Sequence, residues 1–461
     1  MVAMVVSWAW LLGAVPLLCL AFWHATDAWY RAAFFLKHGY KRGSDGVRRR
    51  LPPGHMGLPF LGETLSLLCY FKHAGRPDEF IGVRRRAYGG EKAGMYRTHL
   101  FGSPTIVVCA PMANKFVFQA TDDTFGIHWP VPELVGLNAI GNVEGGNHTR
   151  MRGVLLSAIN RPSSLRTIAA VVQPGVVAAL NSWADMGTIV ASDEAKKVTF
   201  MNICKMFISM DSSPLMVKMD QWFTGLAAGL RALPLDFPGT AIHGARKCRQ
   251  KLNVVFREEL EARKNTAKEY DDVMSGFMEM EDEQGNKLNN DEVVDNIVSS
   301  VFAGYESTAT AIMWAMYHLA KSPDALAKLR EENVAMNETK GGSYFISHDD
   351  ILKMKYTSKV VEETIRMANI ASMAYRVAKR DVEYGGYIIP EGWHVMVMVR
   401  SLHTDPNYYQ DPLTFNPDRR SEPTKPGTYQ VFGGGCRICP GNMLARLQIA
   451  IMLYHLSIGY E

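Results

Sequence analysis

Residues 432–441 read Phe-Gly-Gly-Gly-Cys-Arg-Ile-Cys-Pro-Gly, and this stretch says more about the fold than any other part of the sequence. Gly434 and Gly435 tolerate backbone conformations that other residues avoid, so we expect them to let the chain bend tightly around Cys439. The residues that follow, 442–456, form an apolar run that predicts a helix. The stretch therefore predicts a cysteine held in a tight loop at the start of a helix.

A thiolate in such a loop is a suitable ligand for haem iron. The helix dipole and backbone N–H groups can tune the sulfur, and the thiolate donates electron density that favours O–O cleavage. The stretch resembles the haem-binding loop of cytochrome P450 monooxygenases, Phe-x-x-Gly-x-Arg-x-Cys-x-Gly. All five specified positions match: Phe432, Gly435, Arg437, Cys439 and Gly441. The resemblance implies that haem (iron protoporphyrin IX) is the cofactor and that Cys439 is the axial ligand of its iron.

Cys436 and Cys439 also form a Cys-x-x-Cys pair, which is typical of redox and zinc sites. The sequence contains no second Cys-x-x-Cys and no paired histidines that would complete a tetrahedral zinc site. The pair also lacks the strand-turn-helix context of a thioredoxin-like motif. We therefore favour the haem loop over both alternatives.

The composition is that of a globular protein, with 461 residues of which 47% are hydrophobic and 21% are charged. A net charge of +4 is too small to indicate binding to nucleic acid. Seven cysteines, an odd number, argue against a disulfide framework and indicate a reducing environment. No linker-like composition divides the chain after residue 50. We predict one large catalytic domain, residues 63–461, behind an anchor (1–30) and a basic, proline-rich hinge (31–62).

The N-terminal region predicts a membrane anchor. Residues 5–23 carry no charge and would span about 28 Å as a helix, close to the hydrocarbon thickness of a bilayer. Lysines and arginines follow this segment but none precedes it, which places the N-terminus in the lumen and the rest in the cytosol. A cleaved signal peptide is the alternative, but the segment lacks a basic start and a convincing cleavage site.

Residues 51–62 contain three prolines, which predict a stiff, extended spacer after the anchor. Microsomal members of the cytochrome P450 family carry a similar hinge. The resemblance therefore implies a single-pass protein of the endoplasmic reticulum membrane, in contact with membrane lipid, whose catalytic domain is cytosolic.

The apolar pattern over residues 291–321 predicts an unusually long helix with Gly304, Glu306, Ser307 and Thr308 in its middle. Gly304 costs the helix roughly 1 kcal/mol relative to Ala, and its missing side chain would let haem or dioxygen approach the backbone. The two hydroxyls can bond back to the preceding turn. Small residues packed inside a buried helix are the alternative. The stretch resembles the family's Ala/Gly-Gly-x-Asp/Glu-Thr-Thr, with Ser in place of the first Thr, which implies that Glu306, Ser307 and Thr308 deliver protons.

Glu363 and Arg366 lie three residues apart, a spacing that places them on one face of a helix. Taken alone, such a pair indicates an ordinary surface ion pair that contributes little stability. Arg419 follows the proline-fixed turn of residues 415–418. In the family, Glu-x-x-Arg and Pro-x-Arg elements join into a buried charge triad behind the haem loop. The resemblance implies that Glu363, Arg366 and Arg419 form this structural triad.

Haem propionates require cations, and the sequence offers four candidates. Arg437 belongs to the cysteine loop itself. His148 and Arg152 resemble the aromatic-x-x-x-Arg pattern of a helix in the family, with His in the aromatic place, and their i, i+4 spacing puts both on one helix face. Arg376, ten residues after Arg366, matches another propionate-binding position of the family. A solvated surface side chain is the alternative for each.

The remaining patterns predict a mainly α-helical protein with small antiparallel sheets, which by resemblance is the cytochrome P450 fold. One strand pair is expected within residues 94–110, and another at 384–389 and 393–399 around a turn at 390–392. Residues 252–264 and 348–367 read as helices. Only 22 residues follow Cys439. Members of the family continue through a C-terminal sheet there, so we expect that sheet to be truncated.

Several loops resemble those of plant ent-kaurenoic acid oxidases, which oxidise a diterpenoid acid: residues 51–60, 128–136 and 236–247. The resemblance implies a monooxygenase that uses O₂ and electrons from NADPH–cytochrome P450 reductase to oxidise a hydrophobic small molecule, an ent-kaurenoic-acid-like diterpenoid. Related plant members act on triterpenoids, brassinosteroids or abscisic acid. A haem-thiolate isomerase or dehydratase is disfavoured by the Glu306-Ser307 pair. A truncated, non-catalytic haem-binding or membrane protein is the non-enzyme alternative.

Overall fold

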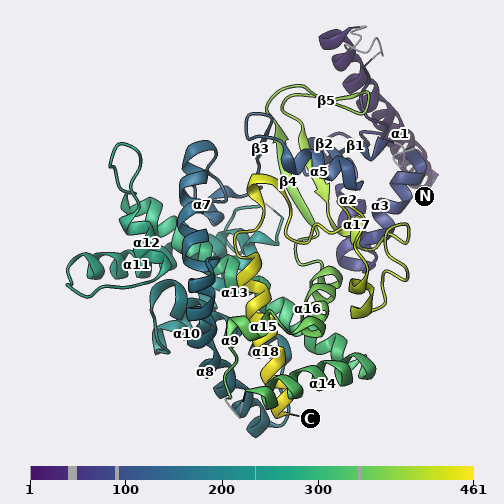
Figure 1. Cartoon of the computed structure of the whole chain (residues 1–461). Helices are drawn as coiled ribbons and strands as arrows, with labels where there is room; N and C mark the ends of the chain where they lie inside the picture. Colours follow the sequence, from purple (N-terminus) through teal and green to yellow (C-terminus); the bar gives the residue numbers. More distant parts are fainter. Residues whose placement is uncertain (1, 40–48, 89–92, 234, 341–343, 461) are drawn as a thin grey trace. The chain divides into compact units, whose positions relative to one another are not determined.

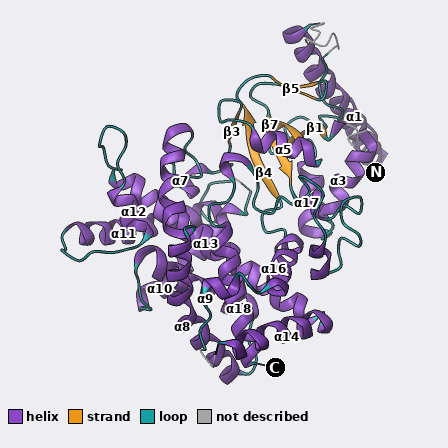
Figure 2. Cartoon of the chain, viewed as in Figure 1, coloured by secondary structure: helices purple, strands orange, loops and turns teal. Residues whose placement is uncertain are grey.

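The computed structural model describes residues 2–39, 49–88, 93–233, 235–340 and 344–460, with side chains described from residue 14 onward. The chain divides into two compact units, which are described separately. Unit 1 comprises Met1–His128, Ala371–Pro412 and Lys425–Arg437, and unit 2 comprises Trp129–Ile370, Leu413–Thr424 and Ile438–Glu461. All the named strands belong to unit 1, whereas unit 2 is built from helices and loops (Figure 2).

Unit 1 begins with the long helix α1 and continues with short helices and two sheets (Figure 1). Its elements are α1 (Val2–His38), α2 (Thr64–Leu68), the π-helix η1 (Cys69–His73), α3 (Pro77–Tyr88), β1 (Met95–Leu100), β2 (Ser103–Val108), α5 (Pro111–Gln119), β3 (Phe125–Ile127), β4 (Met373–Ala378), β5 (Val382–Tyr384), β6 (Tyr387–Ile389), β7 (His394–Met398), α17 (Arg400–His403) and the 3-10 helix η3 (Gly435–Arg437).

The larger sheet has five strands in the order β1-β2-β7-β4-β3. The pair β2–β7 is parallel, with Thr105 opposite His394, and the other neighbours are antiparallel. Successive side chains of a strand point to opposite faces, so Ile106 belongs to one apolar cluster and Val107 to another. Both faces of the sheet are therefore covered, and the sheet forms the interior of unit 1.

The strand pair predicted within residues 94–110 is confirmed by β1 and β2. The second predicted pair is wrong. β5 and β6 form a separate hairpin around Gly385 and Gly386, whose φ angles of +57° and +83° suit a tight hairpin turn. β7 instead lies between β2 and β4, and its parallel pairing with β2 departs from the expected antiparallel arrangement. The position of β7 is fixed by its pairing with β2 and β4, and the local turn at 390–392 does not indicate this pairing.

The C-terminal part of α1 is fixed to the sheet by a buried charge pair. The carboxylate of Asp27, whose residue is 5% exposed, accepts hydrogen bonds from Arg97 on β1 at 3.1 Å and from the backbone N–H of Met56 at 3.2 Å. One helical turn further on, the ring of Tyr30 meets Trp393 edge to face at 5.6 Å. This part of α1 is therefore integrated into unit 1.

Unit 2 consists of packed helices (Figure 1). They are α6 (Pro132–Val135), α7 (Gly145–Ile159), α8 (Pro162–Met186), α9 (Ala191–Ile208), α10 (Pro214–Leu230), α11 (Ala241–Lys264), α12 (Val273–Glu279), α13 (Asn290–Ala320), α14 (Pro323–Thr339), α15 (His348–Ile351), α16 (Lys355–Ala368), the 3-10 helix η2 (Pro417–Ser421) and α18 (Asn442–Gly459).

The helix α13 is the centre of unit 2 and packs against α9, α11, α16 and α18. A capping box of Asn289 and Glu292 satisfies its first N–H groups. α13 confirms the long helix predicted over 291–321, and α18 confirms the one predicted over 442–456. The helix predicted over 348–367 is divided into α15 and α16. Met354, at φ −79° and ψ 85°, leaves the helical conformation there and buries its side chain completely.

The anchor predicted for residues 1–30 coincides with helix α1, but the side chains of residues 1–13 and the whole of the basic stretch 40–48 lie outside the described part of the chain. Among the described residues, α8 is the helix found long and apolar enough to cross a membrane, and 39% of its most apolar window is buried within the protein. A core helix of a soluble protein has the same length and composition. The boundaries of anchor and hinge thus stay predictions.

Replacing Asp27 by Ala tests how α1 is fixed to the sheet. Burial raises the pKa of the Asp27 carboxyl, but the charge and hydrogen bond of Arg97 outweigh burial and hold this pKa below its ordinary value. Without the carboxylate Arg97 stays buried without its charge partner, so we expect the free energy of unfolding in urea to fall by about 3 kcal/mol. Arg31 is a second partner of Asp27 but is 63% exposed. The Arg31→Ala control should cost less than about 1 kcal/mol, and equal losses in both variants would contradict the assignment.

Candidate active site

The first half of the cysteine loop belongs to unit 1 and is shaped by two glycines. Gly433 and Gly435 have φ angles of +73° and +67°, a region that side chains avoid. A Cβ atom at Gly435 would overlap the carbonyl oxygen of Phe118 in α5. The prediction for Gly435 is therefore confirmed, whereas the bend expected at Gly434 falls on Gly433. Phe432, half-buried, precedes the bend.

Two arginines and one carboxylate lie together in unit 1. Arg437 donates from Nη2 and Nε to the two oxygens of Asp122, at 2.7 and 3.2 Å. Arg376 on β4 donates from Nη1 to the carbonyl of Tyr375 at 2.8 Å. Burial and the nearby charge of Arg437 lower the pKa of the Arg376 guanidinium, and Asp122 only partly opposes them. Positive charge exceeds negative charge here, which suits an additional anionic group.

The second half of the loop belongs to unit 2 and carries Cys439. Its backbone is held on both sides of the sulfur-bearing residue. Arg152 on α7 donates to the carbonyl of Ile438 at 2.6 Å, and Asn160, at the end of the same helix, donates to the carbonyl of Pro440 at 2.8 Å. The loop is thus fixed to α7 immediately before α18 begins.

The surroundings of the Cys439 sulfur are suited to a thiolate that is bound to a metal cation. Burial raises the pKa of the Cys439 thiol, while the backbone N–H of Gly441 and the charges of Arg152 and Arg446 oppose this rise. The N–H group and the two cations are aligned to stabilise a thiolate, but burial wins in the free protein. Coordination to a metal cation would reverse the balance, because a coordinating thiol is deprotonated outright.

His148 and Arg152 both lie on α7, one turn apart, as their spacing predicted. His148 is buried and Arg152 is half-buried. Both therefore come from the helix that also supports the cysteine loop, and their role toward a propionate stays a prediction.

Glu306 lies in the middle of α13 and is paired with two cations. Its carboxylate accepts a hydrogen bond from Arg231, which follows α10, and lies 3.5 Å from the ammonium of Lys196 on α9. The glutamate is 8% exposed, but the Arg231 side chain is 64% exposed. The two cations thus connect a buried carboxylate to the surface of unit 2.

The residues beside Glu306 have different surroundings. Ser307 donates its hydroxyl to the carbonyl of Ala303 at 2.8 Å, as predicted from its place in the helix, and Thr308 is buried. Gly304 does not open a groove toward haem or dioxygen on its Cβ side. A Cβ atom there would lie 2.8 Å from the side chain of Ile203, so the missing side chain makes room for the close packing of α9 on α13.

The predicted charge triad is brought together in unit 2. Arg366 donates to both carboxylate oxygens of Glu363 at 2.9 and 2.8 Å, and Arg419 donates to one of them at 2.8 Å. Glu363 and Arg366 are fully buried. Burial alone would raise the pKa of Glu363, but the hydrogen bonds and charges of the two arginines outweigh it and hold this pKa below its usual range.

Sequence reasoning missed the partners of the predicted residues. Asp122 is 315 positions from Arg437, and Arg231 is 75 positions from Glu306. No local motif indicated that Lys196 would pair with Glu306, or that Asn160 would donate to the carbonyl of Pro440. Only the spacing of an acid and a base within one helix turn is visible in a sequence, so no signal could have found these pairs.

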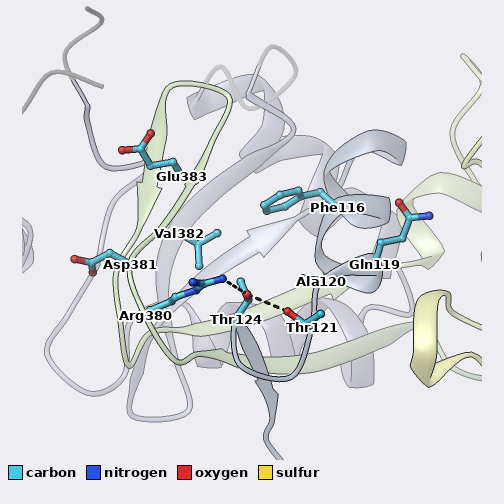
Figure 3. Close-up of a pocket in the computed structure, with 9 residues that line it drawn as sticks. All are labelled: Phe116, Gln119, Ala120, Thr121, Thr124, Arg380, Asp381, Val382 and Glu383. Atoms are coloured by element: carbon cyan, nitrogen blue, oxygen red, sulfur yellow. Dashed lines mark hydrogen bonds between the residues drawn. The ribbon is translucent and has the colours of Figure 1, made fainter. Parts of the chain in front are cut away.

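An open pocket of about 500 Å³ lies elsewhere in unit 1 (Figure 3). In the figure Arg380 reaches toward Thr124, and its Nη2 donates to the threonine hydroxyl at 2.7 Å. The lining residues are Phe116, Gln119, Ala120, Thr121, Thr124, Arg380, Asp381, Val382 and Glu383. None of the predicted site residues is among them, so this pocket is separate from the candidate active site.

Comparison with known proteins decides the family. Residues 52–456 match the family model of cytochrome P450. The chain belongs to the cytochrome P450 family. It is 36% identical over 451 residues to ent-kaurenoic acid oxidase 1 of Hordeum vulgare, covering 95% of this chain and 88% of that protein. It is 34% identical to beta-amyrin 11-oxidase of Glycyrrhiza uralensis, covering 89% and 85%. Among solved structures, retinoic acid bound cyanobacterial CYP120A1 matches with a TM-score of 0.78 and 26% identity, over 89% and 92%.

Membership confirms the predicted cytochrome P450 fold, the oxidoreductase activity of a monooxygenase and haem as the cofactor. It also implies a redox partner and a hydrophobic substrate. The residues present fit the cofactor. Unit 1 offers the cation excess of Arg376 and Arg437, and unit 2 offers the buried sulfur of Cys439 with Arg152 beside its loop. The roles of Cys439 and of these arginines toward haem stay predictions.

Replacing Glu363 by Gln tests the triad of this cytochrome P450. The variant keeps the shape but leaves Arg366 buried without a carboxylate, so we expect the free energy of unfolding at pH 7 to fall by about 3–5 kcal/mol. Because the folded pKa of Glu363 is depressed, its contribution is fully present above the unfolded value of about 4.3 and is lost as pH falls toward the folded value. The variant should therefore lose less stability on acidification than the parent does.

The measurement is urea unfolding of both proteins between neutral and acid pH. Glu362→Gln is a matched control on the same helix, because Glu362 is partly exposed, unlike Glu363, and pairs with the partly exposed Arg446. A loss in Glu363→Gln no larger than that of the control, or an unchanged acid dependence, would argue against a stabilising triad.

Proposed function

We propose that this cytochrome P450 oxidises a terpenoid, and specifically an ent-kaurenoic-acid-like diterpenoid acid. The observation that carries the proposal is the 36% identity, over 95% of the chain, to ent-kaurenoic acid oxidase 1 of Hordeum vulgare. The loops at 128–136 and 236–247, which resemble those enzymes, add support. The solved relative is described as bound to retinoic acid, another apolar carboxylic acid, which is consistent with an acidic, apolar substrate.

In this proposal, haem supplies dioxygen activation when bound, and the chain supplies the ligand, the counter-ions and the protons. Cys439 provides the thiolate. The cations proposed to neutralise the propionates are Arg437, Arg376, Arg152 and His148. NADPH–cytochrome P450 reductase delivers two electrons singly. One oxygen atom of O₂ enters a C–H bond of the substrate, and the other leaves as water after uptake of the two electrons and two protons.

Glu306, Ser307 and Thr308 are proposed to supply these protons. Ser307 donates its hydroxyl to the carbonyl of Ala303, which leaves its oxygen lone pairs able to accept a proton before the hydroxyl turns to donate another. Glu306 is held by Arg231 and Lys196, both of which reach toward solvent. Delivery then requires Glu306 to exchange a cation for a hydrogen bond to water or to Ser307. The two cations therefore control when the acid is available.

The membrane arrangement forms part of the proposal. Within the predicted anchor, residues 1–30, the uncharged run 5–23 would cross the endoplasmic reticulum membrane once, and residues 31–62 would connect the anchor to a cytosolic catalytic domain, 63–461. Support comes from the uncharged run at 5–23 and from the lysines and arginines that follow it. Such a position gives the enzyme direct access to an apolar substrate dissolved in lipid.

A second substrate class is favoured by a separate observation. The similarity to beta-amyrin 11-oxidase is almost as great, at 34% over 424 residues. A triterpenoid is therefore the second candidate. The two classes differ in chemistry, because ent-kaurenoic acid carries a carboxylate whereas β-amyrin carries a hydroxyl.

The test is expression of the full chain with a plant reductase in microsomes. The reduced, carbon monoxide-bound protein should show the strongly red-shifted Soret band of thiolate-ligated haem, and Cys439→Ser should lose it. Incubation with NADPH and ent-kaurenoic acid should then give oxidised products by mass spectrometry. Turnover of β-amyrin alone would favour the second candidate. Thiolate-ligated haem without turnover of either compound would overturn the substrate proposal, and absence of the Soret band would support a non-catalytic protein.

Replacing Glu306 by Gln tests the proton route. The amide cannot supply a carboxylic proton, so we expect product formation to fall by about a hundredfold, the lower end of the range for a general acid. NADPH oxidation should fall less and hydrogen peroxide should rise, because reduced O₂ that is not protonated in the directed way leaves as H₂O₂ with two protons taken from bulk water. Product, NADPH and peroxide are measured together.

Glu292→Gln is the matched control, because Glu292 caps the N-terminus of the same helix, α13. This control should lower stability slightly and leave the ratio of product to NADPH unchanged. If Glu306→Gln kept the ratio of the parent enzyme, Glu306 would have no role in proton delivery.

A further inference from the structure

A cavity of about 420 Å³ lies in unit 2, enclosed by α15, α16 and α18 and by the end of η2. Its inner wall is apolar. Met354 and Val361 from the α16 side and Leu447 and Ala450 from α18 are buried, and each contributes to this wall. At the mouth, Leu352 is 65% exposed. The volume and the apolar wall are those of a small-molecule site, and none of the predicted active-site residues lines the cavity.

The rim of the cavity is cationic. Among the described lining residues, four carry a positive charge and one carries a negative charge: Lys355, Lys359, Arg420 and Arg446 against Glu362. Glu362 is already engaged by Arg446. Lys359 donates to the hydroxyl of Ser421 at 3.0 Å and lies 3.9 Å from Asp418. Arg420 lies 3.9 Å from the carboxylate of Glu363. Among the described lining residues, Lys355 is then the cation for which no carboxylate is counted.

Two of the lining groups form no hydrogen bond within the described structure. The ammonium of Lys355 forms no hydrogen bond or ion pair with another described residue. His348 is 7% exposed, and its Nδ1 lies 3.8 Å from the Asp349 carboxylate but has no hydrogen-bond partner in the part of the chain that the structure describes. A buried polar atom without a hydrogen bond is costly, so a bound polar group that reached Nδ1 of His348 would be favourable.

The open pocket of unit 1 in Figure 3 lacks this combination. There Arg380 is accompanied by two carboxylates, Asp381 and Glu383, and it already donates to Thr124. The charged residues that line that pocket therefore sum to a negative charge, and the pocket is open to solvent. The cavity of unit 2 is the one whose wall and charge together specify a ligand.

We propose that the cavity between α16 and α18 binds an amphipathic carboxylate. The carboxylate would lie at the cationic rim near Lys355, and the apolar body would cover Leu447 and Ala450. Such a ligand satisfies the excess positive charge and removes apolar wall from water at the same time, which neither a neutral hydrocarbon nor an inorganic anion can do. The site is additional to the substrate site and is independent of the proposed substrate.

The experiment uses a photoreactive fatty acid, dodecanoate with a diazirine in its chain, on the full-length holoenzyme. After irradiation the labelled peptides are identified by mass spectrometry. We expect label on residues 351–361 and 443–450, displaced by excess dodecanoate but not by dodecanol. Lys355→Glu should weaken labelling about fivefold, the effect of roughly 1 kcal/mol from one exposed charge. Ser358→Trp, an exposed lining position, should block the mouth and abolish it.

Lys218→Glu is the charge-matched control, because Lys218 is exposed on α10 and does not line the cavity. It should be labelled like the parent protein, and all variants should keep the Soret band of the folded enzyme. Labelling of α16 and α18 that is equal in the parent, Lys355→Glu and Ser358→Trp would overturn the proposal. So would displacement by dodecanol as effective as that by dodecanoate, or label confined to other segments.

Discussion

The carboxylate of Glu363 is the group on which the described part of unit 2 depends most. It is fully buried, and it accepts hydrogen bonds from Arg366 on its own helix, from Arg419 in η2, and from the backbone N–H of Asn416 at 3.3 Å. Arg420 lies 3.9 Å away. A buried charge is tolerated only when its oxygens are satisfied. Glu363 therefore ties the segment 413–424 to α16, although the two are far apart in sequence. The residues that line the α16–α18 cavity include Arg420 of that segment. The contacts of Glu363 therefore also help to hold one side of this cavity in position.

In unit 1 the main constraint is apolar packing, because the five-stranded sheet is covered on both faces. A strand that is buried on both faces does not show the alternation of polar and apolar residues by which a half-exposed strand is recognised. Its sequence therefore does not indicate which strand it pairs with. This explains why β7 joined β2 and β4 rather than the nearer β6. The same unit carries Arg437 and Arg376. Their like charges repel, but the carboxylate of Asp122 attracts both, because it accepts hydrogen bonds from Arg437 and its charge also acts on Arg376.

The sequence was sufficient to predict features that lie within a short stretch of the chain. The cysteine loop, the long helix α13 and the Glu363–Arg366 spacing each reside in a short stretch, and all three appear in the structure where they were expected. What it could not predict depends on distant contacts. Gly304 is needed by Ile203 of another helix, and Glu306 is paired from two further helices. A residue's neighbour 75 or more positions away leaves no pattern within one helical turn, so the chemistry of the site was easier to foresee than its electrostatics.

The exposure of Arg231 has a consequence for how the enzyme responds to its surroundings. Glu306 is buried, but one of its two charge partners lies mostly in solvent. Mobile ions screen exposed charges over about 8 Å at physiological ionic strength, and they screen buried ones much less. Added salt would loosen Arg231 from Glu306 before it affected Lys196, which is better shielded. The carboxylate would then gain freedom without any substitution, so ionic strength alone would change the mobility of Glu306, and with it the proposed supply of protons.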